Sequence, residues 1–178
     1  MLDIWISNGI DILFGDPYWF PHPVRFIGAY ISFFDKHIAK ECKTHSSLKL
    51  LGVLLTLTTV FLSFAAVWLT LKLSFNIGLG FYRVINIFIL YTCLAGKCLH
   101  KEAYKILDSL YRGEIDKAKK QLSYIVGRDV DNMEDKDIVR AVVETVSENT
   151  ADGIIAPLFY MFIGGAPLAL AYKAVNTL

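Results

Sequence analysis

An uninterrupted apolar run constrains the fold of this chain more than any other feature of its sequence. Leu50 to Leu71 is 22 residues long, carries no charged side chain, and is bounded by Lys49 and Lys72. A helix needs only about 20 apolar residues to cross the hydrocarbon core of a bilayer. The run therefore predicts a membrane protein and argues against a water-soluble domain.

Composition and charge narrow the class further. Hydrophobic residues make up 54% of the 178 residues, above the roughly 45–50% that is typical of soluble domains. The formal net charge is +1, so the chain has no global basic field, and nucleic acid is not an expected partner. The three cysteines form no CxxC motif, which argues against a zinc ribbon or a disulfide framework.

The hydropathy pattern predicts an all-α, polytopic membrane protein with one membrane domain made of five segments. Residues 1–14 are apolar but too short to span a bilayer alone. Residues 15–49 form a motif loop and an amphipathic helix, and residues 50–96 form a transmembrane hairpin whose turn lies at 72–83. Residues 97–153 form a polar helical region whose last helix ends at Gly153, and residues 154–178 form a broken apolar segment.

The last segment is expected to be broken or re-entrant. Ile154 to Tyr172 has no charge, yet Pro157, Gly164, Gly165 and Pro167 interrupt it. Non-helical backbone is tolerated at membrane depth only where protein buries it. We therefore expect Lys173, the first charge after this segment, to be reachable from the side of the polar helices or from a cavity at membrane depth.

The distribution of basic residues predicts the orientation in the cell membrane. Lys and Arg number five in residues 15–49, ten in 97–153 and two in the hairpin turn. Cytoplasmic loops carry the excess of Lys and Arg. Both larger polar segments of this multi-pass protein are therefore expected in the cytoplasm.

A stripe of charged residues is the first candidate for chemistry. Arg140, Glu144, Glu148 and Asp152 follow one another at intervals of four, which places them along one helix face. Glu144 with Glu148, or Glu148 with Asp152, would suit Mg²⁺, which takes one or two carboxylates plus substrate phosphates. The alternative is a solvated helix face with an Arg140–Glu144 ion pair.

Three shorter motifs also carry candidate residues, and each has a plainer alternative. Arg128 and Asp129 follow Gly127, where Arg could face a phosphate or the turn could simply end a helix. His22 and Arg25 lie among three prolines, either as a base and an anion clamp or as a membrane-interface turn. Lys173 is either functional or an interfacial lysine that marks the membrane edge.

The motifs, taken in order, resemble one family. GDPYWFPHPVRFIG, IVGRD, VRAVVETVSENTADGIIAPLFY and IGGAPLALAYKAVNTL are similar to the adenosylcobinamide-phosphate synthases, the integral membrane proteins of cobalamin biosynthesis. The resemblance extends from about Gly15 to Leu178. Family members are much longer, so the chain looks like an N-terminal portion.

The resemblance implies a late step of corrin synthesis. The expected reaction joins a carboxylate of adenosylcobyric acid to the amine of (R)-1-amino-2-propanol or its O-phosphate, with ATP as co-substrate and Mg²⁺ as cofactor. The expected partners are the corrinoid, the aminopropanol compound, the lipid bilayer and other corrin-pathway membrane enzymes. The rival reading is a non-enzymatic corrinoid-binding, transport or scaffold protein.

The motif positions and the chemistry of acyl activation together give each candidate an expected role. The catalytic candidates are His22, Asp129 and Lys173, with His22 or Asp129 as the base. The expected substrate- and phosphate-binding residues are Asp16, Arg25, Arg128, Arg140, Asn149 and Asn176. The expected metal ligands are Glu144, Glu148 and Asp152.

Overall fold

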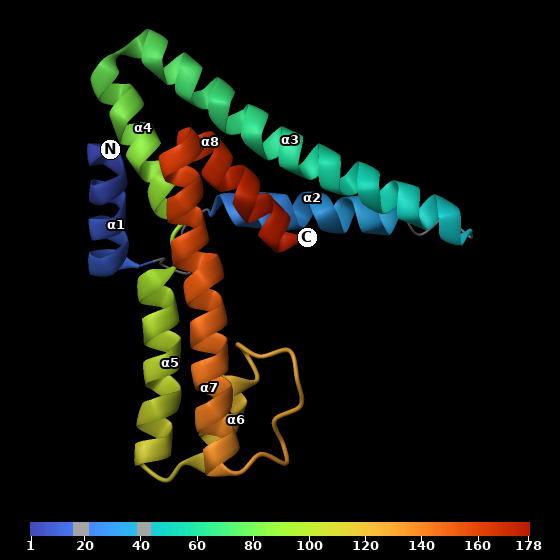
Figure 1. The fold of residues 1–178 in the computed structure, drawn as a ribbon, viewed down its shortest axis with the longest axis vertical. Coiled ribbons are helices and arrows are strands. Elements are labelled where there is room, and N and C mark those ends of the chain that lie inside the picture. Colours follow the sequence, from blue (N-terminus) through green and yellow to red (C-terminus); the bar gives the residue numbers. More distant parts are fainter. Residues whose placement is uncertain (16–21, 39–43) are drawn as a thin grey trace.

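The described part of the chain is helical throughout (Figure 1). The computed structural model describes residues 1–15, 22–38 and 44–178. Within these ranges no strand occurs, so the expected all-α class is confirmed. The elements are α1 (Leu2–Phe14), α2 (Pro23–His37), α3 (His45–Ile77), α4 (Leu79–Thr92), α5 (Gly96–Tyr111), α6 (Ile115–Leu122), α7 (Asp135–Thr150), the π-helical turn η2 (Ala151–Ile155) and α8 (Ala156–Thr177).

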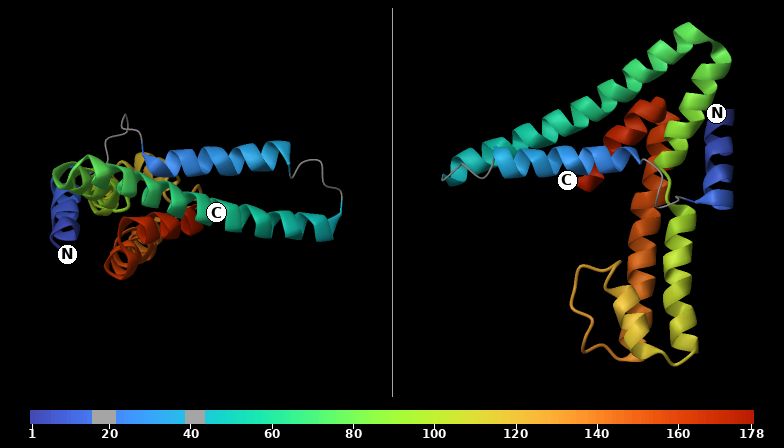
Figure 2. Two further views of the ribbon diagram at one scale, coloured as in Figure 1. Left: turned by 90° about the horizontal axis from the view of Figure 1, so that it is seen from above. Right: turned by 180° about the vertical axis from the view of Figure 1, so that it is seen from behind.

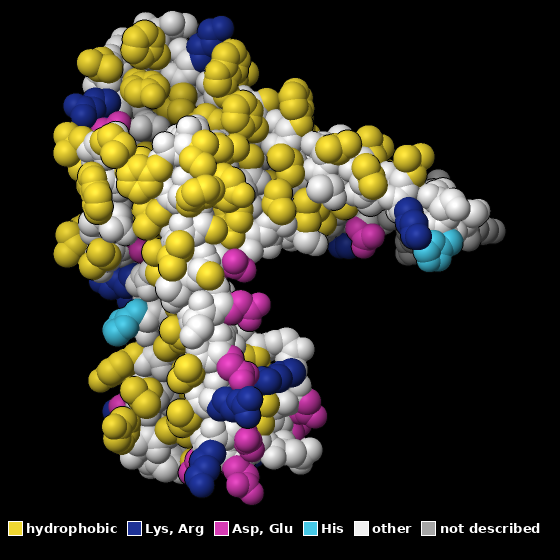
Figure 3. All heavy atoms as spheres, viewed as in Figure 1, with side chains coloured by type: hydrophobic (Ala, Val, Ile, Leu, Met, Phe, Trp, Pro, Cys, Tyr) yellow, Lys and Arg dark blue, Asp and Glu magenta, His cyan; other side chains and the backbone are white. Residues whose placement is uncertain are grey.

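Three helical stretches of the described chain are long and apolar enough to cross a membrane. They are His45–Ile77, Leu79–Tyr111 and Asp135–Thr177, which makes the chain a multi-pass membrane protein. Figure 3 shows hydrophobic side chains covering the part built from α1, α3, α4 and α8, with the charged side chains gathered mainly over α5 to α7. The buried face of α3 combines the polar residues Thr59, Ser63 and Ser74 with the apolar residues Val67 and Leu71. Small polar residues of this kind are common where membrane helices pack closely.

Helices α3 and α4 form a hairpin whose turn is shorter than expected. Hydropathy placed the turn at residues 72–83, but α3 continues to Ile77 and the chain reverses at Gly78. The two charged residues that indicated a long turn, Lys72 and Arg83, lie inside helices α3 and α4. Lys72 lies over the ring of Trp68 at 4.9 Å, and Arg83 pairs with Asp3 of α1 at 3.2 Å.

The last apolar segment is bent, as expected from its glycines and prolines. Gly164 and Gly165 leave helical geometry inside α8, with φ values of −139° and 67°. Figures 1 and 2 show that the second arm of α8 folds back, so that the C-terminal end lies near α2. Asn176 thereby reaches Asp152, with Nδ2 donating to Oδ2 at 3.4 Å. The residues that flank the two ends of this segment, Asp152 and Asn176, consequently lie in contact.

Gly153 does not end a helix, contrary to expectation. The helix that begins at Asp135 passes through the π-helical turn η2 into α8. Gly153 packs beside Ala95: the Ala95 N–H donates to the Gly153 carbonyl at 3.1 Å, and a Cβ on Gly153 would make an ordinary van der Waals contact with the Ala95 side chain at 3.6 Å. π-helical turns of this kind are frequent at functional sites.

A polar joint connects the apolar part to the helices below it. Asp11 of α1 is 2% exposed, and its Oδ2 accepts a hydrogen bond from the Gly96 N–H at 2.9 Å. This bond satisfies one of the open donors at the start of α5. Nearby, the Lys97 ammonium donates to the Leu13 carbonyl and the Tyr91 hydroxyl donates to the Gly15 carbonyl. The end of α1 is thus fixed to the junction of α4 and α5.

Helices α5, α6 and α7 enclose a second, smaller core. Its buried members are Ile106, Ala118, Leu122, Val130, Ile138 and Ala141. Ile106 comes from α5, Ala118 and Leu122 come from α6, and Ile138 and Ala141 come from α7. Val130 belongs to the irregular loop between α6 and α7, which it anchors against these helices. The loop therefore has a fixed position beside α7.

Candidate functional site

Two adjoining cavities open where the polar helices meet the returning arm of α8. The Lys173 cavity, of about 360 Å³, is lined by Lys173 together with Ala95, Cys98, Leu99, Glu102, Tyr124 and Gly153. The Arg128 cavity, of about 420 Å³, is lined by Arg128, Val126, Gly127, Glu144 and Glu148. The two share Ile125, Thr145, Asn149, Asp152 and Asn176. We call this pair of cavities the cleft.

The three predicted carboxylates all line the Arg128 cavity. Glu144 and Glu148 come from α7, and Asp152 comes from η2. Each step of four residues advances about 6 Å along a helix, so neighbouring carboxylates can contact one ligand while the outer two are far apart. Asp152 also lines the Lys173 cavity and is therefore the carboxylate at the centre of the cleft.

The returning arm of α8 positions Asp152. Asn176 Nδ2 donates to one carboxylate oxygen at 3.4 Å, and the Tyr172 hydroxyl donates to the other at 3.4 Å. The same hydroxyl lies 3.3 Å from the Asp152 backbone carbonyl. The ring of Tyr172 stacks on Tyr160, with centroids 4.9 Å apart. The bend in α8 is therefore what completes this side of the cleft.

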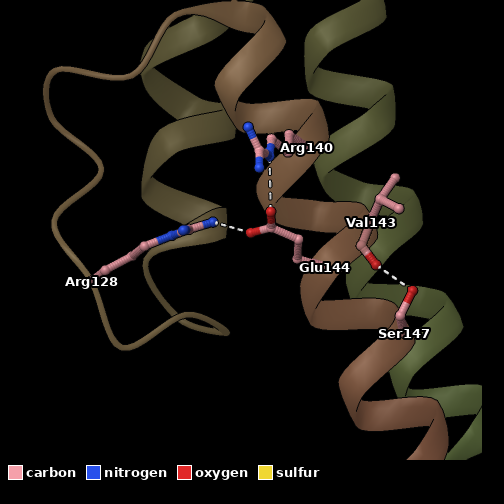
Figure 4. Close-up of polar contacts among 5 residues, drawn as sticks. All are labelled: Arg128, Arg140, Val143, Glu144 and Ser147. Atoms are coloured by element: carbon pink, nitrogen blue, oxygen red, sulfur yellow. Dashed lines mark hydrogen bonds and ion pairs between the residues drawn. The ribbon is translucent and has the colours of Figure 1, made fainter.

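Two arginines hold Glu144. Figure 4 shows Arg128 reaching from the α6–α7 loop and Arg140 reaching along α7 to the same carboxylate. Arg128 Nη2 lies 2.8 Å from Oε2, and Arg140 Nε lies 2.9 Å from Oε1. The expected Arg140–Glu144 pair is thus present, and the loop adds a second guanidinium that spacing along α7 could not indicate. On the next turn, Ser147 donates to the Val143 carbonyl at 2.8 Å and adds no group to the cluster.

His22 lies at the start of α2, close to Lys173 and Arg25. Its Nδ1 accepts a hydrogen bond from the Val24 N–H at 3.3 Å, which makes it the N-cap of α2. Burial lowers the pKa of His22 below its ordinary value of 6.5, and the charges of Lys173 and Arg25 lower it further, while a hydrogen bond with the Thr92 backbone opposes them. His22 is therefore neutral at pH 7. It does not line the described walls of the cleft.

Asp129 does not line the described cleft walls. Asp129 Oδ1 accepts a hydrogen bond from the Asp131 N–H at 3.0 Å and so shapes the α6–α7 loop. This Asp-centred turn is a common local structure. Asp16 lies outside the described residues. Both assignments stay predictions from the sequence.

The oxygen atoms that line the cleft fit a hard divalent cation whose remaining ligands come from water and a substrate. Glu148, Asp152 and the Asn149 side chain line one cavity, and their oxygens are of the kind that Mg²⁺ prefers. No group of three or more His, Cys, Asp or Glu gathers within the described ranges. Two carboxylates nevertheless suffice, because Mg²⁺ usually keeps several waters and completes its shell with substrate phosphates.

Sequence reasoning missed several residues that line the cleft. Glu102 of α5 and Tyr124 of the α6–α7 connection face the Lys173 cavity, and Thr145 lies between the two cavities. Glu102 is paired with Lys105 at 2.6 Å, three residues along α5. That spacing is common on solvated helix faces, so nothing in the sequence distinguished it. Only the packing of α5 against α7 and η2 brings Glu102 to the cleft.

The fold and the cleft define a helical integral membrane protein with a charge-lined site beside a bent apolar segment. Comparison with known proteins gives its family. A family model described as "CobD/Cbib protein" matches residues 4–178. The chain belongs to this family.

Curated relatives of the chain agree with the family. "Cobalamin biosynthesis protein CobD" of Clostridium tetani is 45% identical over 181 residues, which covers 100% of this chain and 56% of the relative. The protein of the same name from Citrobacter koseri is 44% identical, covering 95% of this chain and 53% of the relative. "Cobalamin biosynthesis protein CbiB" of Salmonella typhi is 41% identical with the same coverage. The chain thus spans about half the length of these relatives, and no solved structure matches it.

Proposed function

We propose that the full-length protein acts in late cobalamin biosynthesis as an ATP- and Mg²⁺-dependent amide-forming ligase. It would join adenosylcobyric acid to (R)-1-amino-2-propanol or its O-phosphate and so give adenosylcobinamide or its phosphate. The observation that carries the proposal is the convergence of Arg128, Glu148, Asp152, Lys173 and Asn176 on one cleft. Membership of the family and the names of the relatives support the pathway.

The chemistry requires activation of the carboxylate. A carboxylate does not react with an amine at neutral pH, but it can take the terminal phosphoryl group of ATP to give an acyl phosphate and ADP. The amine then attacks the acyl carbon, the amide forms, and inorganic phosphate leaves with the proton balance completed by a base. Catalysis of such steps depends on positioning and on neutralising phosphate charge.

The residues of the cleft divide naturally among these tasks. Glu148 and Asp152 would hold Mg²⁺, which when bound neutralises phosphate charge. Arg128, Arg140 and Lys173 would hold phosphate or carboxylate groups, since cations with several N–H donors favour such anions. Asn149 and Asn176 would hydrogen-bond to the substrates. The proposed cytoplasmic orientation gives this cleft access to ATP.

The test is an assay of amide formation by the full-length protein in detergent. Adenosylcobyric acid, aminopropanol O-phosphate, ATP and Mg²⁺ are supplied, and the product is identified by mass. Product that requires both ATP and Mg²⁺ supports the proposal. Tight binding of the corrinoid by folded protein with no product would favour a binding, transport or scaffold role instead.

The metal assignment predicts a specific effect of Glu148→Gln. Loss of one of two carboxylates should raise the Mg²⁺ concentration needed for half-maximal activity by on the order of tenfold, equivalent to about 1.4 kcal/mol of binding free energy. The measurement is amide formation across a Mg²⁺ titration. Full activity of Glu148→Gln at limiting Mg²⁺ would contradict the assignment.

A further inference from the structure

Glu144 lies between two guanidinium groups that come from different parts of the chain. Its Oε2 accepts a hydrogen bond from Arg128 and its Oε1 accepts one from Arg140, at 2.8 and 2.9 Å. Arg128 belongs to the loop after α6 and lies 16 positions earlier in the sequence. One carboxylate therefore fixes a loop arginine beside a helix arginine, as Figure 4 shows.

Stability alone does not account for this arrangement. The side chains of Arg128, Glu144 and Arg140 are 51%, 47% and 80% exposed, and exposed ion pairs contribute only about 0–1 kcal/mol. Two positive charges brought together around one negative charge leave this cluster of three side chains with a net charge of +1. The cluster can attract an anion, most strongly when a cation offsets the Glu148 and Asp152 carboxylates of the same cavity. Arg128 lines that cavity, and Arg140 pairs with Glu144 of its wall.

The guanidinium donors are suited to a phosphate group. A guanidinium carries five N–H donors in a planar fork, and the bonds to Glu144 engage Nη2 of Arg128 and Nε of Arg140. Planar forks of this kind bind phosphate through two parallel hydrogen bonds. Holding both side chains in place before the ligand arrives reduces the conformational entropy lost on binding.

The same arrangement makes Glu144 a poor ligand for a divalent cation. Each carboxylate oxygen already accepts a charge-assisted hydrogen bond, and Mg²⁺ at Glu144 would lie beside two positive guanidinium groups. Glu148 and Asp152 differ in this respect. In the described ranges no Lys or Arg forms an ion pair with either of them, although both line the same cavity.

We propose that Glu144 is a positioning residue, which holds Arg128 and Arg140 as a binding site for a phosphate group and takes no part in binding Mg²⁺. The phosphate belongs to a substrate, and this identity rests on the proposed ligase function. The division of the stripe follows: Arg140 binds phosphate, Glu144 positions Arg140 and Arg128, and Glu148 and Asp152 bind the cation. The metal role that the sequence suggested for Glu144 is thereby replaced.

Two binding measurements on the full-length protein in detergent separate these roles without turnover. Inorganic pyrophosphate, titrated by calorimetry, reports the phosphate site, and Mn²⁺, followed by electron paramagnetic resonance, reports the cation site. Glu144→Gln should weaken pyrophosphate binding by on the order of fivefold and leave Mn²⁺ binding within about twofold. Glu148→Gln should do the reverse and weaken mainly Mn²⁺ binding.

Two further variants guard against a trivial loss of structure. Glu114→Gln removes the Lys117–Glu114 pair, 2.6 Å apart on the same polar helices, and should change neither binding constant. Arg128→Lys keeps the charge but removes the planar fork, and should weaken pyrophosphate binding alone. Thermal unfolding of each variant checks that its fold is retained.

The outcome that overturns the proposal is clear. If Glu144→Gln weakens Mn²⁺ binding as much as Glu148→Gln does, Glu144 is a metal ligand. If Glu144→Gln changes neither binding constant while Arg128→Lys weakens pyrophosphate binding, Glu144 does not position the arginine. If the protein binds both pyrophosphate and Mn²⁺ but forms no amide, the ligase function is refuted. The roles of Glu144 and Glu148 in binding can still be measured in that case.

Discussion

At the scale of single residues, His22 shows how one side chain can serve both local structure and charge balance. Its Nδ1 caps α2, which requires an unprotonated nitrogen. Burial and the nearby charges of Lys173 and Arg25 keep the pKa low. The neutral ring thus adds no charge of its own beside these two cations.

The low pKa of His22 predicts that the stability of the fold depends on pH. The folded state binds a proton at His22 less tightly than the unfolded chain does. The free energy of unfolding should therefore decrease as the pH falls through 6.5, the ordinary pKa of His. Lys173→Gln removes the positive charge that helps to lower the pKa of His22, so it should move this pKa up toward 6.5. Carbon-13 NMR of labelled histidine rings across pH 4–8, a range of about four units around the value expected for His, measures this shift.

A matched variant gives the control for that titration. Lys101→Gln removes a cation on α5 that does not contribute to the pKa of His22, and it should leave the pKa unchanged. An unaltered His22 pKa in Lys173→Gln would mean that burial and Arg25 lower it without Lys173. Lys173 would then not lie close enough to act on the ring.

At the scale of secondary structure elements, α8 depends on two adjacent glycines. Gly165 has φ of 67°, in the left-handed region that favours glycine. Its neighbour Gly164 could not carry a Cβ without approaching the Leu168 side chain to 2.8 Å. The bend therefore rests on conformational freedom at one position and on space at the other. Pro167 follows where the second arm resumes its helix.

Gly165→Ala should strain this bend. The left-handed conformation costs an L-residue roughly 1–2 kcal/mol, so the variant should unfold at a lower temperature in detergent. Gly80→Ala is the matched control, because a Cβ there has open space around it inside α4. That control should be neutral or slightly stabilising, since Ala favours helix more than Gly does. Equal melting temperatures for both variants would show that α8 can rearrange without cost.

At the scale of the whole molecule, the cleft forms where an apolar, membrane-crossing part meets a polar helical part. The joint consists of Asp11, Gly96 and Lys97, and it also places Ala95 beside Gly153. Ala95 and Gly153 both line the Lys173 cavity. The way α1 is attached therefore bears directly on the shape of the site, although α1 itself contributes no residue to the described cleft walls.

This architecture predicts which positions share one face of the membrane. Asn176, after the bend, and Ser123, on the polar helices, should be accessible from the same side, whereas Asn76 in the hairpin should be accessible from the other. Asn176→Cys, Ser123→Cys and Asn76→Cys in a cysteine-free full-length protein test this with a membrane-impermeant thiol reagent. The sidedness of Ser123→Cys in intact cells also tests the cytoplasmic orientation.

Opposite labelling of Asn176→Cys and Ser123→Cys would contradict the re-entrant path. The last segment would then cross the membrane completely, and Lys173 would be separated from the polar helices. A shared side for all three positions would instead contradict the hairpin.

Part of the site could be predicted because its residues lie on one helix. The spacing of Glu144, Glu148 and Asp152 follows from helical geometry, and the structure places all three on one cavity. Apart from Arg140, which lies four residues before Glu144, the partners of these carboxylates could not be predicted. Arg128 approaches across a loop, and Tyr172 and Asn176 approach only because α8 turns back.

The sequence by itself determined what is local: the apolar spans, the polar helices and the break in the last segment. These features depend on side chains close together in the chain, whose periodicity and charge set whether a helix forms and whether lipid surrounds it. The tertiary structure alone decided which distant groups meet, such as Asp11 with Gly96 across 85 positions. Hydrogen bonds act only over about 3 Å, so the packing of whole helices, and no pattern along the chain, decides these contacts.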